Sequence, residues 1–119
     1  MLPHERTLTK LAIAEDAYYG VLLASEDANV TESHLDEKTH ALVRLGALVA
    51  LNATSPGYMW SVESARRHGA TEGEIAGCLI ATLPAIGIAN VVAATPQLAL
   101  ALGYDITAAL EERGFVDVG

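Results

Sequence analysis

The sequence predicts an all-α protein, a single domain over residues 1–119 built as a bundle of about six helices. Three observations predict this fold. Apolar residues recur three and four positions apart in several segments, which is the spacing of one helix face. Residues that start and stop helices separate these segments, and no segment shows the strict alternation of a strand. A chain of 119 residues also has the usual length of one domain.

The first predicted helix begins after Thr7 and ends near Ala24. Its apolar stripe consists of Leu8, Leu11, Tyr18 and Leu22. The segment 25–33 that follows is rich in polar and acidic residues. We therefore predict a linker there rather than a helix.

Two further helices are predicted from their end signals. The second helix is expected to begin with Asp36 as its N-cap, because acidic residues suit the positive end of a helix, and to end near Asn52. Ser55 and Pro56 predict the start of the third, with serine at the cap and proline in the first turn, where no amide hydrogen is needed. That helix is expected to end at Gly69, a residue that adopts the left-handed conformation readily.

The remaining chain predicts three more helices. Thr71 begins a capping box with the glutamate three positions on, and the helix that it opens is expected to end near Pro84. A fifth helix is predicted over residues 86–103, kinked or broken before Pro96. A last, short helix is predicted at residues 106–113.

The composition predicts self-association. Apolar residues make up 51% of the chain and charged residues 18%, against a usual share of about 25%. The mean hydropathy is +0.30. A monomer of this size buries only about two-thirds of the surface of its unfolded chain. Because so much apolar surface is more easily hidden between subunits, we predict a homo-oligomer.

Charge and cysteine content exclude several classes of protein. Fifteen acidic and seven basic residues give a net charge of −8, which opposes binding to nucleic acid and to anionic membranes. The single cysteine, Cys78, excludes an intrachain disulfide and a Cys-x-x-Cys redox pair. The first ten residues do not have the pattern of a signal peptide. The expectation is a cytoplasmic enzyme or binding protein.

A long uncharged run needs a separate explanation. Residues 75–104 contain no charged side chain and are numerous enough to span a bilayer. However, Pro84 and Pro96 divide the run, and its flanks are acidic, with no basic residue to set an orientation. We therefore expect core or interface helices and no membrane partner.

Residues 35–90 carry an ordered set of motifs. They read LDEKTHALVRLGALVALNA, then a helix ending in RRHGAT, then EGEIAGCLIATLPAIGIAN. This order resembles the core of the carboxymuconolactone decarboxylase and alkyl hydroperoxidase D family, with its "LD-x-KT" helix, its catalytic helix ending in "GAT" and its following "E-E-I" helix. The resemblance implies a helical bundle that forms trimers or hexamers, with an active cavity at or near subunit contacts.

This chain departs from the family at its catalytic positions. Counted back from Gly69, the positions of the two family cysteines fall on Thr54 and Gly57, and that of the catalytic histidine falls on Ser61. The position of the relay acid falls on or next to Ala41. Without a thiolate there is no nucleophile to attack a peroxide or a disulfide. We therefore do not expect a thiol peroxidase, and we expect no cofactor.

The third predicted helix offers replacement groups. One face carries Thr54, Gly57 or Tyr58, Ser61 and Ala65, because residues three and four apart are neighbours. Tyr58 and Ser61 can donate hydrogen bonds to a carboxylate or enolate oxygen, so both are candidate catalytic residues, and Thr54 is a candidate substrate contact. The alternative is that Tyr58 and Ser61 only complete the packing. Trp60 is a candidate substrate contact and is otherwise expected to be a core or interface anchor.

The second predicted helix carries a stripe formed by Asp36, His40 and Arg44. His40 is the best remaining general acid or base, because its charge changes near neutral pH. Arg44 can hold a substrate carboxylate in a two-pronged fashion. The alternative is a solvated face whose charges pair with one another.

Two other features predict no chemistry. Glu37 and His40 have the Glu-x-x-His spacing of helical di-iron sites, but such sites need two of these motifs and only one is present, so we expect no metal. Cys78 lies on an apolar segment and is expected to behave as a small buried hydrophobe.

Two functional hypotheses follow. The first is a cofactor-independent lyase or isomerase that acts on a small carboxylated or lactone-like metabolite, with acid–base groups from His40, Tyr58 and Ser61. The second is a non-catalytic helical oligomer that binds a small molecule or serves as a structural subunit.

Overall fold

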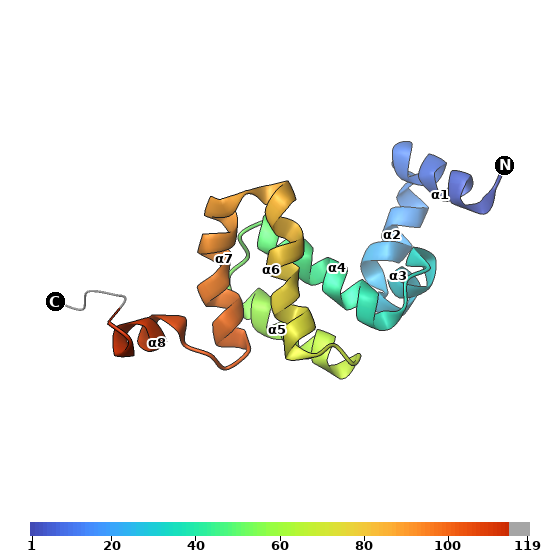
Figure 1. Ribbon diagram of the computed structural model, residues 1–119. Coiled ribbons are helices and arrows are strands. Elements are labelled where there is room, and N and C mark those ends of the chain that lie inside the picture. Colours follow the sequence, from blue (N-terminus) through green and yellow to red (C-terminus); the bar gives the residue numbers. More distant parts are fainter. Residues whose placement is uncertain (115–119) are drawn as a thin grey trace. The chain divides into compact units, whose positions relative to one another are not determined.

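The computed structural model describes residues 1–114, which contain eight α-helices and no β-strand (Figure 1). The prediction of an all-α fold is confirmed, whereas the expected number of about six helices is wrong. The chain divides into two compact units. The N-terminal unit is Met1–Asp36, and the second unit, here called the core unit, begins at Glu37.

The N-terminal unit accounts for the additional helices. It contains α1 (Pro3–Ala12), α2 (Asp16–Ala24) and α3 (Glu26–Ser33). The single helix predicted from Thr7 to Ala24 is wrong, because Ala14 adopts a left-handed backbone, with φ of 54°, and separates α1 from α2.

The predicted linker at residues 25–33 is also wrong, because these residues begin and form α3. The side chain of Ser25 accepts a hydrogen bond from the amide of Ala28, at 3.1 Å, and so caps the helix. Glu26 and Asp27 follow in the first turn, where the helix dipole favours acidic side chains. The polar composition that suggested a linker is therefore an N-terminal helix signal.

The core unit follows the sequence prediction closely. Its helices are α4 (Glu37–Ala50), α5 (Ser55–Arg67), α6 (Glu72–Ile86), α7 (Ile88–Ala101) and α8 (Ile106–Glu112). The N-cap of α5 is Thr54, one residue before the predicted serine. Of the two alternatives predicted before Pro96, a break is wrong, because α7 continues through this residue.

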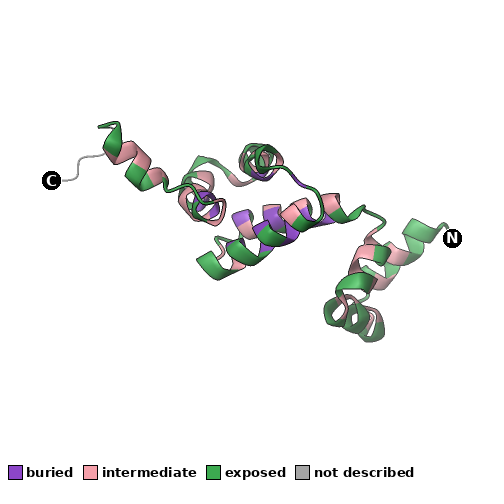
Figure 2. Cartoon of the chain, turned by 90° about the horizontal axis from the view of Figure 1, so that it is seen from below, coloured by how far each residue is buried: buried purple, intermediate pink, exposed green. Residues whose placement is uncertain are grey.

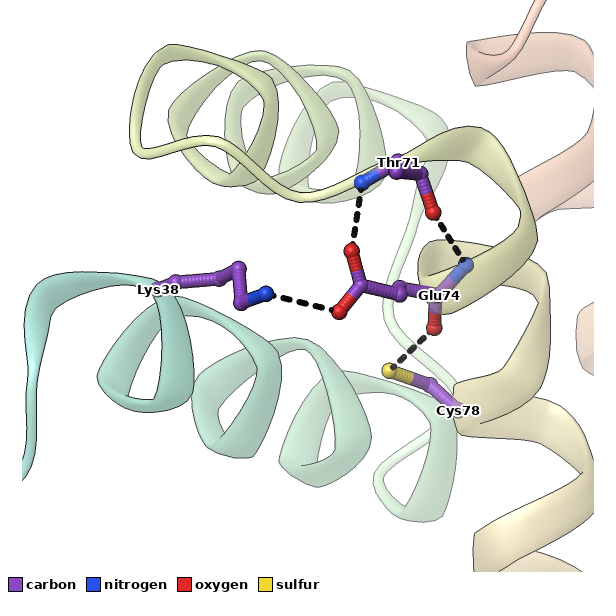
Figure 3. Close-up of polar contacts among 4 residues, drawn as sticks. All are labelled: Lys38, Thr71, Glu74 and Cys78. Carbon is purple, nitrogen blue, oxygen red and sulfur yellow. Dashed lines mark hydrogen bonds and ion pairs between the residues drawn. The ribbon is translucent and has the colours of Figure 1, made fainter.

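The capping box of α6 is confirmed. The hydroxyl of Thr71 accepts from the amide of Glu74 at 3.0 Å, and the amide of Thr71 donates to Glu74 Oε1 at 2.9 Å. Glu74 Oε2 also lies 2.9 Å from Lys38 Nζ of α4 (Figure 3). These contacts lower the pKa of Glu74 to about 2, first through the Thr71 backbone hydrogen bond and then through Lys38.

Replacing this carboxylate is expected to remove a pH-dependent contribution to the stability of the wild type. An acid whose pKa falls on folding stabilises the fold above its unfolded pKa, 4.5 for Glu74, and loses that effect as the pH falls towards 2. The difference in unfolding free energy between the wild type and Glu74→Gln should therefore be largest above pH 4.5 and shrink towards pH 2. Urea denaturation across this range measures it, with Glu63→Gln on the exposed face of α5 as the control. A pH-independent difference would contradict the assignment.

The hydrophobic core is built by α4, α5, α6 and α7 (Figure 2). Helix α4 packs against α5, α6 and α7, and α7 packs against α5 and α6. The largest fully buried side chains are Tyr58, Leu45, Ile75, Leu98, Val49 and Val62. By contrast, α1, α2 and α3 contain no buried residue. The core unit therefore provides the packed framework on which a site can be held.

The uncharged run 75–104 forms most of α6 and all of α7. Ile75 and Leu98 are buried, as the core interpretation predicts. Ile80 and Ile88 are about three-quarters exposed, so for them only the interface interpretation stays as a prediction. Within residues 1–114, no single helix has the length and apolar character needed to cross a membrane; α7 and α8 meet these criteria only as a pair, with a 98° bend between them.

Candidate functional site

The structure brings three of the predicted site residues together in one hollow between α4 and α5. This α4–α5 hollow has a volume of about 380 Å³. Its lining consists of Arg44, Ala47, Leu48, Gly57, Trp60 and Ser61. Arg44 and Ser61 supply its polar side chains. Ala47 and Leu48 supply apolar side chains, Trp60 an indole ring and Gly57 its backbone. The hollow thus combines a cation, a hydroxyl and an aromatic face.

Arg44 and Trp60 form a cation–π pair at this hollow. Arg44 Cζ lies 5.2 Å from the centroid of the Trp60 ring. Stacking on a ring uses the flat face of the guanidinium, while its N–H donors point outward in the plane of the group. Trp60 is 52% exposed, so the core alternative is wrong, and its role as an interface anchor stays a prediction. Its large surface-accessible ring is available as a wall for a bound molecule.

Ser61 lies one turn along α5 from Gly57 and is buried, with 5% of its surface exposed. Its place in the α4–α5 hollow follows from the helical spacing that put Gly57 and Ser61 on one face. A buried hydroxyl is a hydrogen-bond donor and acceptor of fixed position. Among the three predicted catalytic residues, Ser61 is the one that lines this hollow.

Tyr58 points into the core instead of the hollow. Its side chain is fully buried, and its hydroxyl donates to the backbone oxygen of Leu48 at 3.3 Å. Burial raises the pKa of the phenol above its usual value of 10.0. A phenol that is enclosed by packing and bonded to the backbone is suited to holding α5 against α4.

His40 and Thr54 lie outside the lining of the hollow. His40 is on α4, one turn before Arg44, and only 5% of its surface is exposed. The alternative interpretation of this stripe as a solvated face is therefore wrong for His40. Thr54 is exposed at the N-cap of α5. The roles predicted for these two residues stay predictions.

Cys78 is buried on α6. Its Sγ lies 3.7 Å from the backbone oxygen of Glu74 and 3.8 Å from that of Leu42. Burial raises the pKa of the thiol above its ordinary value of 9.0. Because the thiolate is the nucleophilic form, a raised pKa slows the reactions of this thiol at neutral pH.

The sequence interpretation missed a second, larger hollow between α4 and α6. This α4–α6 hollow has a volume of about 560 Å³. Its lining includes Leu42, Val43, Gly46, Gly77, Cys78 and Ala81. The signal in the sequence was a glycine inside each of two predicted helices, Gly46 and Gly77. A glycine inside a helix indicates that another backbone approaches closely or that the space beside it is open. Only the packing of α4 on α6 shows that the two glycines face the same space.

Within the described part of the chain, no group of three or more histidine, cysteine, aspartate or glutamate side chains is placed to hold a metal ion. Glu37, from the Glu-x-x-His motif, has its Oε2 atom 3.5 Å from Nε2 of His68 at the end of α5. The imidazole of His68 thus lies beside a carboxylate at the C-terminal end of α5.

Comparison with known proteins leaves the family open. No protein-family model, no curated protein and no solved structure matches this chain. The resemblance to the carboxymuconolactone decarboxylase and alkyl hydroperoxidase D family therefore stays a prediction, carried by the motifs in residues 35–90.

Proposed function

We propose that this protein binds a small carboxylated molecule in the α4–α5 hollow, as a homo-oligomeric, divergent relative of the carboxymuconolactone decarboxylase family. The observation that carries the proposal is the arrangement of Arg44 over Trp60 with Ser61 in the same hollow. The volume of about 380 Å³ falls in the range of small-molecule sites, about 300–1,000 Å³.

Each group in the hollow has a distinct task in this proposal. The guanidinium of Arg44 donates two parallel hydrogen bonds to the ligand carboxylate. The ring of Trp60 and the side chains of Ala47 and Leu48 cover the apolar body of the ligand. The hydroxyl of Ser61 hydrogen-bonds a second oxygen atom. Because the chain carries a net charge of −8, an anion needs such a local cation to bind here.

Self-association is supported by apolar side chains left exposed on the core unit. Ile80 is 75% exposed, Ile88 74% and Val92 65%. Large apolar side chains left exposed on α6 and α7 are more stable when a second copy of the chain covers them. A trimer or hexamer is the assembly that the family resemblance implies.

Catalysis by a lyase or isomerase is the second candidate. The supporting observation is that Ser61 shares the hollow with Arg44, while His40 lies one turn from Arg44 on the same helix. A serine hydroxyl is a weak acid and base by itself and needs a neighbouring base for activation. Binding is therefore the better-supported function, and acid–base turnover requires His40 to reach the ligand.

Benzoate provides a direct test, because it joins one carboxylate to one flat apolar ring. Trp60 is the only tryptophan, so its fluorescence reports on this hollow alone. We expect benzoate to change the fluorescence saturably, and Arg44→Ala to raise the Kd about tenfold through loss of a charged hydrogen-bond pair. Benzamide, which has the same shape without the charge, should bind weakly to both proteins.

Calorimetry checks the Kd independently of the fluorescence change that Arg44→Ala itself causes. Arg67→Ala, on the exposed end of α5, is the matched control and should leave the Kd unchanged. Equal binding of benzoate and benzamide, or an Arg44→Ala protein with wild-type affinity, would overturn the proposal.

A further inference from the structure

The α4–α6 hollow is separate from the site proposed above. It lies on the α6 side of α4, and its lining shares no residue with that of the α4–α5 hollow. The lining residues lie within residues 39–46 of α4 and 74–82 of α6. At a rise of about 1.5 Å per residue, each helix contributes a wall roughly 10–12 Å long.

Small residues form the floor of this hollow. A Cβ atom added to Gly77 would meet no heavy atom within 4 Å, so the space beside its backbone is open. A Cβ atom on Gly46, across the hollow, would lie 3.4 Å from Cγ2 of Thr82. Ala81 follows Gly77 one turn later on the same face of α6, and Leu42 and Val43 rise beside them. Backbone and methyl groups thus present a shallow, flat apolar surface.

The polar groups around the hollow are already paired (Figure 3). Glu74 is the charged residue in the lining, and it is balanced by Lys38, whose Nζ lies 2.9 Å from Oε2. Its other oxygen accepts from the amide of Thr71. The hydroxyl of Thr82 donates to the backbone oxygen of Cys78 at 2.7 Å. The hollow therefore offers no unbalanced charge to a ligand.

We propose that the α4–α6 hollow is a second binding site, for a neutral, flat, apolar molecule of one or two rings. A charged ligand loses its hydration here without gaining an opposite charge, whereas a neutral ring gains contact with the apolar floor and walls. The volume of about 560 Å³ is of the size found for small-molecule sites.

The dimensions favour a small molecule over a second copy of the chain. A stable protein interface buries about 800 Å² on each partner. The nine residues that line the hollow cover only about two turns of each helix and provide much less than this. A one- or two-ring molecule, by contrast, matches the length of the walls.

The test uses 2-naphthol as the neutral probe and 2-naphthoate as its anionic counterpart. Cys78 is the only cysteine and lines this hollow, so its rate of modification by a thiol reagent reports on occupancy. We expect 2-naphthol to bind saturably and to slow the modification of Cys78. Gly77→Leu, which places a side chain in the open space, should weaken 2-naphthol binding by about tenfold or more. Ala76→Leu, on the exposed face of α6, should retain it.

The experiment tests the two proposed sites independently of each other. Arg44→Ala should leave 2-naphthol binding unchanged, since Arg44 lines the other hollow. Circular dichroism checks that both leucine variants are folded. Equal 2-naphthol binding by Gly77→Leu and Ala76→Leu would overturn the inference, as would protection of Cys78 by 2-naphthoate as strong as that by 2-naphthol. A loss of oligomer mass in Gly77→Leu alone would assign the hollow to a second copy and overturn it too.

Discussion

Tyr58→Ala is expected to lower the free energy of unfolding by about 3–5 kcal/mol, the usual result of deleting a fully buried aromatic ring. The Tyr58 ring has no exposed surface and contacts the core between α4 and α5. Its removal leaves a cavity that the surrounding helices fill only in part. Urea denaturation measures the loss, and Met59→Ala, next along α5 and 64% exposed, should change stability by no more than about 0.5 kcal/mol.

Tyr58→Phe distinguishes packing from catalysis at the same position. Phenylalanine keeps the ring and loses the hydrogen bond to Leu48, so the loss of stability should be about 1 kcal/mol. A structural role predicts unchanged benzoate binding in the folded Phe protein. Two outcomes would place the phenol in the site instead of the core. The first is a free energy of unfolding for Tyr58→Ala equal to that of the wild type. The second is a loss of benzoate binding in Tyr58→Phe without a loss of stability.

Gly87→Ala is expected to destabilise the fold by about 1–3 kcal/mol. Gly87 is the single residue between α6 and α7, with φ of 87° and ψ of 164°. This region of backbone space is essentially restricted to glycine, because a Cβ atom collides with the backbone there. An alanine strains the turn although no heavy atom lies within 4 Å of the added Cβ. Thermal and urea unfolding should both show the loss.

Gly77→Ala provides the matched control for Gly87→Ala, because the same Cβ atom is added inside α6 instead of at its C-cap. Gly77 has ordinary helical geometry inside α6 and open space beside it. Alanine there should raise stability by up to about 1 kcal/mol, the difference in helix propensity. Changes of opposite sign at the two glycines support this account of the turn, and equal changes would contradict it.

The starts of two helices in the core unit were predictable from local signals in the sequence. The starts of α5 and α6 follow from Pro56 and from the Thr71 capping box, since caps act within one turn of the chain. The N-terminal unit was less predictable, because the break at Ala14 rests on a left-handed alanine that no sequence rule favours. Likewise, the charged and polar residues after Ser25 suit a helix start as well as a linker.

The candidate site was predictable only in part. Helical spacing correctly placed Gly57 and Ser61 on one face of α5, because that relation is local. Spacing could not decide that Tyr58 and His40 are buried, since burial depends on which neighbouring helix covers a face.

The helix signals and apolar periodicity of this chain specify that it forms helices and where most of those in the core unit begin and end, because such interactions act within a few residues. The tertiary structure alone decides that Arg44 stacks on Trp60 and that Gly46 and Gly77 face one hollow. Those pairs are joined by the packing of α4 on α5 and on α6, and contacts between distant segments follow from how the whole core fills its space.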